Sequence, residues 1–165
     1  MSSFQVVAIP TEVADHVRST GKSPTYGFPA HREVATGRAP CRHCLKLIER
    51  GQEELLLFTY DPFREFGEPP LPGPVYIHAK DCLRYSGGDV IPEEYQGRLL
   101  TLKGYGEDRA LLKEIRVSNG EEQMAAEQLF REPNVRYAHV RSTEAGCFLF
   151  RLERPQLVVV RNLEI

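Results

Sequence analysis

The sequence predicts an α+β fold, a single domain over residues 1–165 with a mostly antiparallel β-sheet and a few short α-helices. A length of 165 residues fits one domain with one self-sufficient core. Most apolar segments are short and lie between turn residues, in keeping with the 13 Gly and 12 Pro of the chain. Helical signals occur in three segments, so strands are expected to predominate.

The N-terminal part, residues 4–20, predicts a strand followed by a helix. Residues 4–9 read FQVVAI, an apolar run typical of a strand, and Pro10 ends it. Thr11 is a suitable N-cap for a helix that reaches about residue 20. We therefore expect the chain to begin with one strand and one short helix.

The next two segments predict an ordered loop and a second helix. Residues 23–40 are rich in Pro and Gly, with a short strand at 33–35. From Pro40 to Gly51 apolar residues recur at i, i+3, i+4 and i+7, the spacing of one helical face. The residues of this face are Cys41, Cys44, Leu45 and Ile48.

The rest of the chain predicts further strands and one more helix. Residues 54–60 and 74–79 are typical of strands, and the proline-dense residues 61–73 form a long loop between them. The remaining expected elements are strands at residues 99–105, 111–117, 135–141, 147–154 and 157–160, and a helix from residue 118 or 119 to about 131.

Composition and charge exclude several classes of function. With 21 Lys and Arg against 23 Asp and Glu, the formal net charge is -2, which gives no broad basic surface for nucleic acid or an anionic membrane. No apolar run approaches the roughly 18 residues of a membrane span. The apolar run at residues 6–9 is also shorter than a signal-peptide core of about 7–15 residues. We therefore expect a cytoplasmic protein whose four cysteines stay reduced.

Two pairs of soft ligands predict a zinc site. Cys41 and Cys44 form one pair, and His78 and Cys82 form the other. Zinc binds thiolate and imidazole in a tetrahedron, and two ligands two to four residues apart can occupy two corners from one turn of chain. Cysteines at a helix N-terminus are also more readily ionised. The sequence thus predicts a structural Cys3His zinc site that clamps a helix to a strand end.

Two other interpretations of these cysteines stay open. Cys41 and Cys44 lie on the same predicted face as Leu45, so they can be packing residues of an amphipathic helix. A redox Cys-x-x-Cys is the second, although no βαβ unit precedes Cys41. His43 is expected to point away from the two cysteines, as an outer contact of the site or as a surface group.

A second candidate cluster consists of His139 and Cys147, on the strands that flank residues 142–146. In an antiparallel hairpin the two are near-opposite, and a His beside a Cys is the arrangement that activates a thiolate nucleophile. The alternative is a half-buried histidine with a core cysteine. For an enzyme, we expect Arg42 and Tyr60 to line the substrate pocket.

Several segments also carry a family resemblance. They are Tyr26-Gly27, residues 40–45, residues 55–63, residues 73–79 together with Cys82, and residues 137–154. In this order, over residues 26–154, the chain resembles the bacterial family known as domain of unknown function 1203. The resemblance implies a compact cytoplasmic bacterial domain and implies no reaction.

The resemblance also implies which site residues are shared across the family. These are Cys41, Arg42, His139 and Cys147. Cys44, His78 and Cys82 would belong to a branch of the family that completes the four-ligand site. Zinc would then be a property of this branch.

Three functional hypotheses follow from the sequence. The first is a binding or regulatory module with a structural zinc site. The second is a small enzyme in which Cys147 or Cys41 is the nucleophile and His139 the base, or in which an open metal site holds a water. The third is an interaction domain that forms a homodimer through the edge strand at residues 157–160. The substrate, the partner and the role of His31 stay open.

Overall fold

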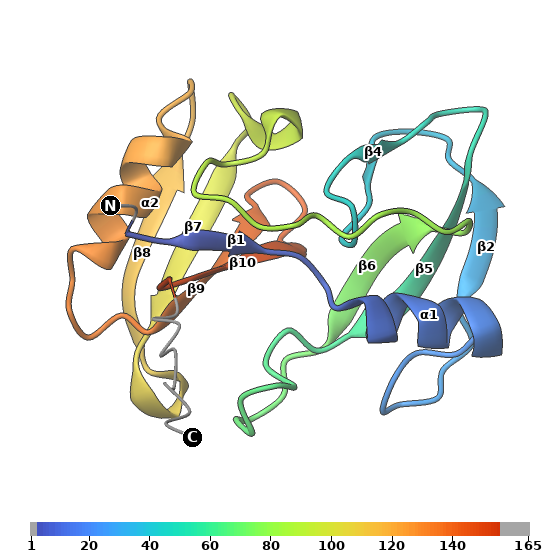
Figure 1. The fold of residues 1–165 in the computed structure, drawn as a ribbon, viewed down its shortest axis with the longest axis horizontal. Helices are drawn as coiled ribbons and strands as arrows, with labels where there is room; N and C mark the ends of the chain where they lie inside the picture. The colour runs from blue at the N-terminus through green and yellow to red at the C-terminus, as the bar shows by residue number, and fades with distance from the viewer. Residues whose placement is uncertain (1–2, 156–165) are drawn as a thin grey trace, which may run out of the picture.

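The computed structural model describes residues 3–155, which form two β-sheets, a small β-hairpin and two α-helices (Figure 1). Every strand pair in this part of the chain is antiparallel. The predicted α+β class with a mostly antiparallel sheet is therefore confirmed. No helix among residues 3–155 is long and apolar enough to cross a membrane.

The larger sheet has five strands in the order β1-β10-β9-β7-β8. They are β1 (Gln5–Val7), β7 (Leu100–Tyr105), β8 (Leu111–Val117), β9 (Tyr137–Ser142) and β10 (Phe148–Glu153). Helix α2 (Glu122–Phe130) packs on this sheet. Apolar residues such as Leu102, Leu129 and Phe150 are fully buried between them, and their burial is the main stabilising contribution here.

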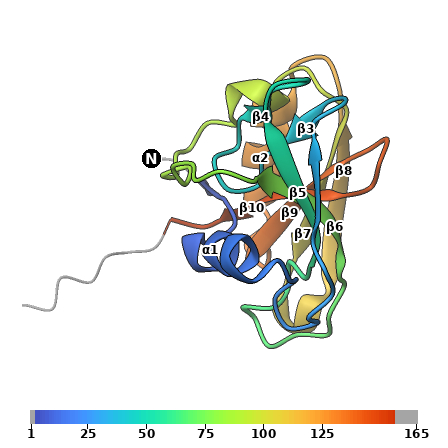
Figure 2. The same ribbon diagram turned by 90° about the vertical axis from the view of Figure 1, so that its right-hand side faces the viewer.

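The smaller sheet has three strands in the order β2-β5-β6. They are β2 (His31–Val34), β5 (Glu54–Tyr60) and β6 (Gly73–His78). Helix α1 (Thr11–Thr20) packs against this sheet, as Figures 1 and 2 show, through Val13, Ala14 and Val17. Burial alternates along β5 from Leu56 to Tyr60, because one face of the strand meets the core.

The predicted helix at residues 41–51 is wrong. These residues instead form the turn of a hairpin between β3 (Ala39–Pro40) and β4 (Leu47–Ile48). Leu45 has a φ of 60°, which a right-handed helix cannot contain. A four-residue turn gives the same i, i+3 spacing as one turn of helix, so periodicity alone could not distinguish them.

The two sheets are joined by chain that runs directly between them. Strand β1 of the larger sheet continues into α1 beside the smaller one, and residues 79–92 return in the opposite direction (Figure 1). Phe148 of β10 lies in the core of the smaller sheet, with its ring centroid 6.0 Å from that of Tyr60. The short 3-10 helix η1 (Glu93–Tyr95) then leads into β7, and η2 (Glu107–Arg109) links β7 to β8.

The other predicted elements match the structure within a few residues. The helix expected from residue 118 or 119 begins at Glu122, and the expected strand at 33–35 is β2. Thr11 is the first residue of α1, and its side chain does not cap the helix. The expected edge strand at residues 157–160 lies outside the described residues.

Candidate metal centre

The structure brings the four predicted metal ligands together. The Sγ atoms of Cys41, Cys44 and Cys82 and one ring nitrogen of His78 all lie within 4.8 Å of one another. Cys41, Cys44 and His78 are buried, and Cys82 is half-buried. Residues separated by up to 41 positions in the chain thus form one compact group that can hold a metal ion.

Two of the distances within the group are close to those around a tetrahedral ion. The Sγ atoms of Cys41 and Cys82 are 3.9 Å apart, and Cys44 Sγ lies 3.5 Å from His78 Nδ1. Metal–ligand bonds of about 2.3 Å to sulfur and about 2.05 Å to nitrogen would place tetrahedral neighbours about 3.8 Å and about 3.6 Å apart. The side chains are therefore already arranged around the volume that an ion would occupy.

The turn of the β3–β4 hairpin holds the first two ligands. The backbone N–H of Leu45 donates to the carbonyl of Cys41 at 2.9 Å, and the N–H of Cys41 donates to the carbonyl of Lys46 at 2.9 Å. The left-handed conformation of Leu45 reverses the chain directly after Cys44. Such a conformation costs about 1–2 kcal/mol for a residue with a side chain, so it is typical of a site that the rest of the structure holds in place.

The end of β6 supplies the other two ligands. His78 is the last residue of β6 and pairs with Leu55 of β5, so the sheet fixes its backbone. Its Nδ1 faces the cluster, and its Nε2 lies 3.3 Å from a carboxylate oxygen of Glu53. A carboxylate on the second nitrogen fixes the orientation of a ligating imidazole. The Glu53 carboxylate accepts a hydrogen bond from the backbone N–H of Glu49, and this bond is the main cause that lowers its pKa. The carboxylate therefore stays charged.

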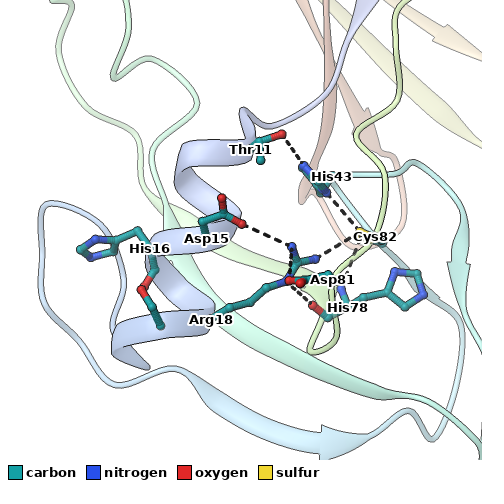
Figure 3. A network of polar contacts seen from close by, with 10 residues as sticks. Thr11, Asp15, His16, Arg18, His43, His78, Asp81 and Cys82 are labelled. Carbon is teal, nitrogen blue, oxygen red and sulfur yellow. Dashed lines mark hydrogen bonds and ion pairs between the residues drawn. The ribbon is translucent and has the colours of Figure 1, made fainter.

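Two side chains from outside the cluster, those of Arg18 and His43, contact Cys82 (Figure 3). Arg18 extends from α1, and its Nη2 donates to Cys82 Sγ at 3.2 Å, while its Nε donates to the carbonyl of His78. His43 Nδ1 lies 3.1 Å from the same sulfur, and His43 Nε2 lies 2.9 Å from the hydroxyl of Thr11. His43 is thus a buried outer contact of the site, one of its two expected places.

Hydrogen bonds, mainly those within the cluster, make the pKa values of its thiols unequal. The pKa of Cys82 is lowered, first through hydrogen bonds with Cys41 and Cys44 and further by His43. The pKa of Cys44 is raised by hydrogen bonds with Cys41 and Cys82 and by burial. Contact with Cys41, and then with Cys82, raises the pKa of His78 to about 10. The cluster therefore ionises most readily at Cys82.

Arg42 lies between Cys41 and Cys44 in the sequence, but its side chain points to the larger sheet. Its Nε donates to the carbonyl of Phe148 at 2.8 Å, its Nη1 to the carbonyl of Pro40 at 2.7 Å, and its Nη2 to Cys147 Sγ at 3.2 Å. The side chain is 1% exposed and lines a cavity between the two sheets. The turn that carries the candidate ligands Cys41 and Cys44 thus also positions this guanidinium.

His139 and Cys147 are not brought together as a catalytic pair. The strand register places Arg151 opposite His139, whereas the carbonyl of Cys147 accepts the N–H of Ser142. The expectation that the two are near-opposite is therefore wrong, because the turn closes between residues 142 and 147. Neither ring nitrogen of His139 has a hydrogen-bond partner among the described residues.

The surroundings of His139 are aromatic and apolar. Its ring lies 4.4 Å from Phe63 and 5.1 Å from Phe148, measured between centroids, and it has no exposed surface. Burial, reinforced by nearby cations of which Arg141 is the strongest, holds its pKa well below the usual value. His139 is therefore a neutral core residue here.

The other two residues singled out in the sequence lie elsewhere. Tyr60 is buried, and burial raises its pKa to about 12. It lines a smaller cavity than Arg42 does, although Cys147 borders both. His31 is exposed on β2, and its Nε2 lies 3.1 Å from the carboxylate of Glu33. The structure gives His31 no part in the cluster.

Several residues of this region carry no sequence signal. Arg18 is a basic residue in the last turn of a helix, where a favourable interaction with the helix dipole already accounts for it. Glu53 comes directly before a strand and resembles any solvated carboxylate. Both reach the candidate metal centre only because the fold brings α1 and β5 beside the end of β6.

Comparisons with known proteins give one match. The family sequence model described as "Protein of unknown function (DUF1203)" matches residues 38–154, which include all four candidate ligands. No curated protein and no solved structure matches the chain.

Proposed function

The chain belongs to the DUF1203 family, whose description assigns no function, and we propose that it is a binding module stabilised by a structural zinc ion. The ion would be held by Cys41, Cys44, His78 and Cys82. The observation that carries the proposal is the grouping of four soft ligand atoms within 4.8 Å of one another, with two of the distances between them close to those of a tetrahedral zinc site.

The donor set favours zinc over magnesium and calcium. Three thiolates and one imidazole are soft ligands that suit zinc and do not suit magnesium or calcium, which prefer oxygen. Three thiolates around a divalent ion leave a net charge of about -1. The guanidinium of Arg18, 3.2 Å from Cys82 Sγ, is placed to balance this charge.

A structural role follows from the number of ligands. Four protein ligands fill a tetrahedral zinc ion and leave no position for a water or a substrate. The ion would join the β3–β4 hairpin to the end of β6, in addition to the hydrogen bond that the Arg42 N–H donates to the Tyr76 carbonyl. Arg42 would then be held in the orientation that lines the cavity between the sheets.

The enzyme alternative draws less support from the geometry. A base for Cys147 would have to lie within hydrogen-bond reach of its sulfur, and the ring nitrogens of His139 have no partner in the described part of the chain. Cys41 lies within the metal cluster, where coordination would mask it as a nucleophile. A cytoplasmic location, in which thiols stay reduced, is part of the proposal.

The test is the zinc content per chain, measured by elemental mass spectrometry on protein purified without chelators. We expect about one zinc per chain in the wild type and its loss in Cys44→Ser and Cys82→Ser, together with a large fall in thermal stability. Cys147→Ser is the matched control, because it removes the fourth cysteine of the chain and leaves the cluster intact. It should keep the zinc.

Two results would overturn the proposal. One is wild-type protein without zinc that also fails to take up zinc added in solution. The other is a Cys82→Ser variant that keeps both its zinc and its thermal stability, since a closed four-ligand site cannot lose a ligand without effect.

A further inference from the structure

A cavity of about 650 Å³ lies where the two sheets, the β3–β4 hairpin and the loop between β9 and β10 meet. This volume falls in the range of pockets for small molecules. Part of its wall is apolar, through Leu57, Pro74, Leu99, Leu100 and Leu149. The cavity is therefore suited to a ligand with an apolar body.

The polar part of the wall is mainly cationic. Arg38, Arg42 and Arg98 line it, against the carboxylate of Glu144. Burial, and after it the charge of Arg98, lowers the pKa of Arg38. A concave wall with an excess of positive charge raises the local concentration of anions.

Arg42 is buried without an acidic partner. Its donors reach two carbonyls and a thiol, and no carboxylate lies within ion-pair distance of it among residues 3–155. Arg151, a similarly buried arginine, is paired with Glu65 at 3.0 Å and Glu153 at 2.6 Å. Since an uncompensated buried charge is costly, a bound anion near Arg42 would be stabilising.

Tyr95 adds an unused hydrogen-bond group. It lines the same cavity and is 2% exposed, and its hydroxyl has no hydrogen-bond partner within the described chain. Buried hydroxyls are nearly always hydrogen-bonded, so a missing partner points to a group that the protein alone does not supply. An anionic oxygen could accept this hydrogen bond.

Cys147 lies where this cavity meets a second one of about 220 Å³. Arg141 lines the second cavity, and its Nε and Nη2 are buried without partners in the part of the chain that the structure describes. The thiol lies 3.2 Å from Nη2 of Arg42 and borders the same cavity as Arg141. A ligand in either cavity would come close to its sulfur.

We propose that the larger cavity binds a small organic anion, with a carboxylate or phosphate head held by Arg38, Arg42, Arg98 and Tyr95, and with Cys147 beside it. The proposal rests on the binding function proposed above and names its ligand class, but it does not require the metal. Zinc content and anion binding are measured separately, so that either part can fail alone.

The Cys147 thiol provides the test, because alkylating reagents of equal size differ in charge. Iodoacetate is an anion and iodoacetamide is neutral. In both reactions the Cys147 thiolate attacks the methylene carbon, the S–C bond forms as the C–I bond breaks, iodide leaves, and the thiol proton goes to the buffer. The ratio of the two rates at Cys147, measured by peptide mass spectrometry on the zinc-loaded full chain, reports the preference for an anion.

We expect this ratio to be about tenfold higher in the folded protein than for the same thiol in urea. Arg98→Gln should lower the ratio about threefold or more while leaving the zinc content unchanged. Arg32→Gln is the control, because Arg32 lies on β2, does not line the cavity and is 55% exposed in its side chain. A ratio equal to that in urea, or one that Arg98→Gln leaves unchanged, would overturn the proposal.

A second arm of the experiment identifies the anionic head. Benzoate, phenyl phosphate and neutral benzamide share a ring and are compared for protection of Cys147 against iodoacetamide. Stronger protection by benzoate assigns a carboxylate, and stronger protection by phenyl phosphate assigns a phosphate. Equal protection by benzamide, or protection by none of the three, would contradict an organic-anion site.

Discussion

Arg42 donates a hydrogen bond of 2.8 Å from its Nε to the backbone carbonyl of Phe148, which lies 106 residues away in the larger sheet. Because Arg42 follows Cys41 directly, one turn of chain carries both a candidate metal ligand and a hydrogen bond between the hairpin and β10. The proposed metal centre and the proposed anion cavity are thus adjacent and share a structural support.

This arrangement predicts that Arg42→Lys destabilises the protein by about 2–3 kcal/mol. Lysine keeps the charge, but a single ammonium group cannot satisfy the two carbonyls and the thiol that the planar guanidinium reaches. The free energy of unfolding in urea is the measurement. Arg32→Lys, on an exposed arginine, should change it by less than about 0.5 kcal/mol, and equal stabilities of the two variants would contradict the bridging role.

A side chain at Gly104 is expected to destabilise the protein at the contact between β7 and α2. A Cβ on this residue would lie 3.0 Å from Leu129 Cδ1 and 3.2 Å from Val135 Cγ2, both in the core. Gly104→Ala should therefore cost about 1–3 kcal/mol, because the core has no room to accept the methyl group. Gly37→Ala is the control, since a Cβ there meets nothing within 4 Å, and it should leave the thermal midpoint unchanged.

The elements that the sequence predicted correctly are those with a local signal. Strands β5 and β10 have apolar runs bounded by turn residues, and α1 has its apolar face at helical spacing. The close grouping of Cys41, Cys44, His78 and Cys82 was predictable for a similar reason. Two pairs at short spacing are a local pattern, and the chemistry of thiolate and imidazole connects the pairs without knowledge of the fold.

The errors arose where the fold decides between local alternatives. The apolar residues in the turn that carries Cys41 and Cys44 have the spacing of a helix. Leucine disfavours a positive φ, so nothing in the sequence indicated that Leu45 adopts one. The hairpin register, which separates His139 from Cys147, depends on how tightly the turn closes. Contacts such as those of Tyr95 and Arg98 with the cavity join distant segments, so no local pattern could reveal them.

Substitution of Glu53 is expected to weaken metal binding. Its carboxylate lies 3.3 Å from Nε2 of His78, so Glu53→Gln removes the charge that orients the imidazole and increases its basicity. We expect zinc affinity, measured by competition with a chromophoric chelator, to fall about tenfold. Glu54→Gln is the matched control, because the neighbouring Glu54 pairs with Arg32 instead. Equal affinities in the two variants would mean that Glu53 has no role at the metal.

The burial of His139 is expected to make the stability of the protein depend on pH, independently of any effect of pH on metal binding. Its pKa is held well below 6.5 in the folded protein by burial and by cations that face it from neighbouring strands and loops. These cations are Arg141, Arg151, Arg109 and Lys103. In the unfolded chain the imidazole titrates near pH 6.5. Below that pH the unfolded state binds a proton that the folded state does not, so stability is full above pH 6.5 and falls as the pH decreases.

The variant His139→Leu removes this proton and should flatten the curve. Zinc release in acid affects both proteins, so the quantity to measure is the difference between their free energies of unfolding at pH 7 and pH 5. Linkage predicts that the wild type loses about 2 kcal/mol more than the variant over this range. Parallel curves would instead mean that His139 accepts a proton in the folded state, which is the property that a catalytic base needs. The same titration therefore tests whether His139 is a core residue or retains a place in an enzymatic mechanism.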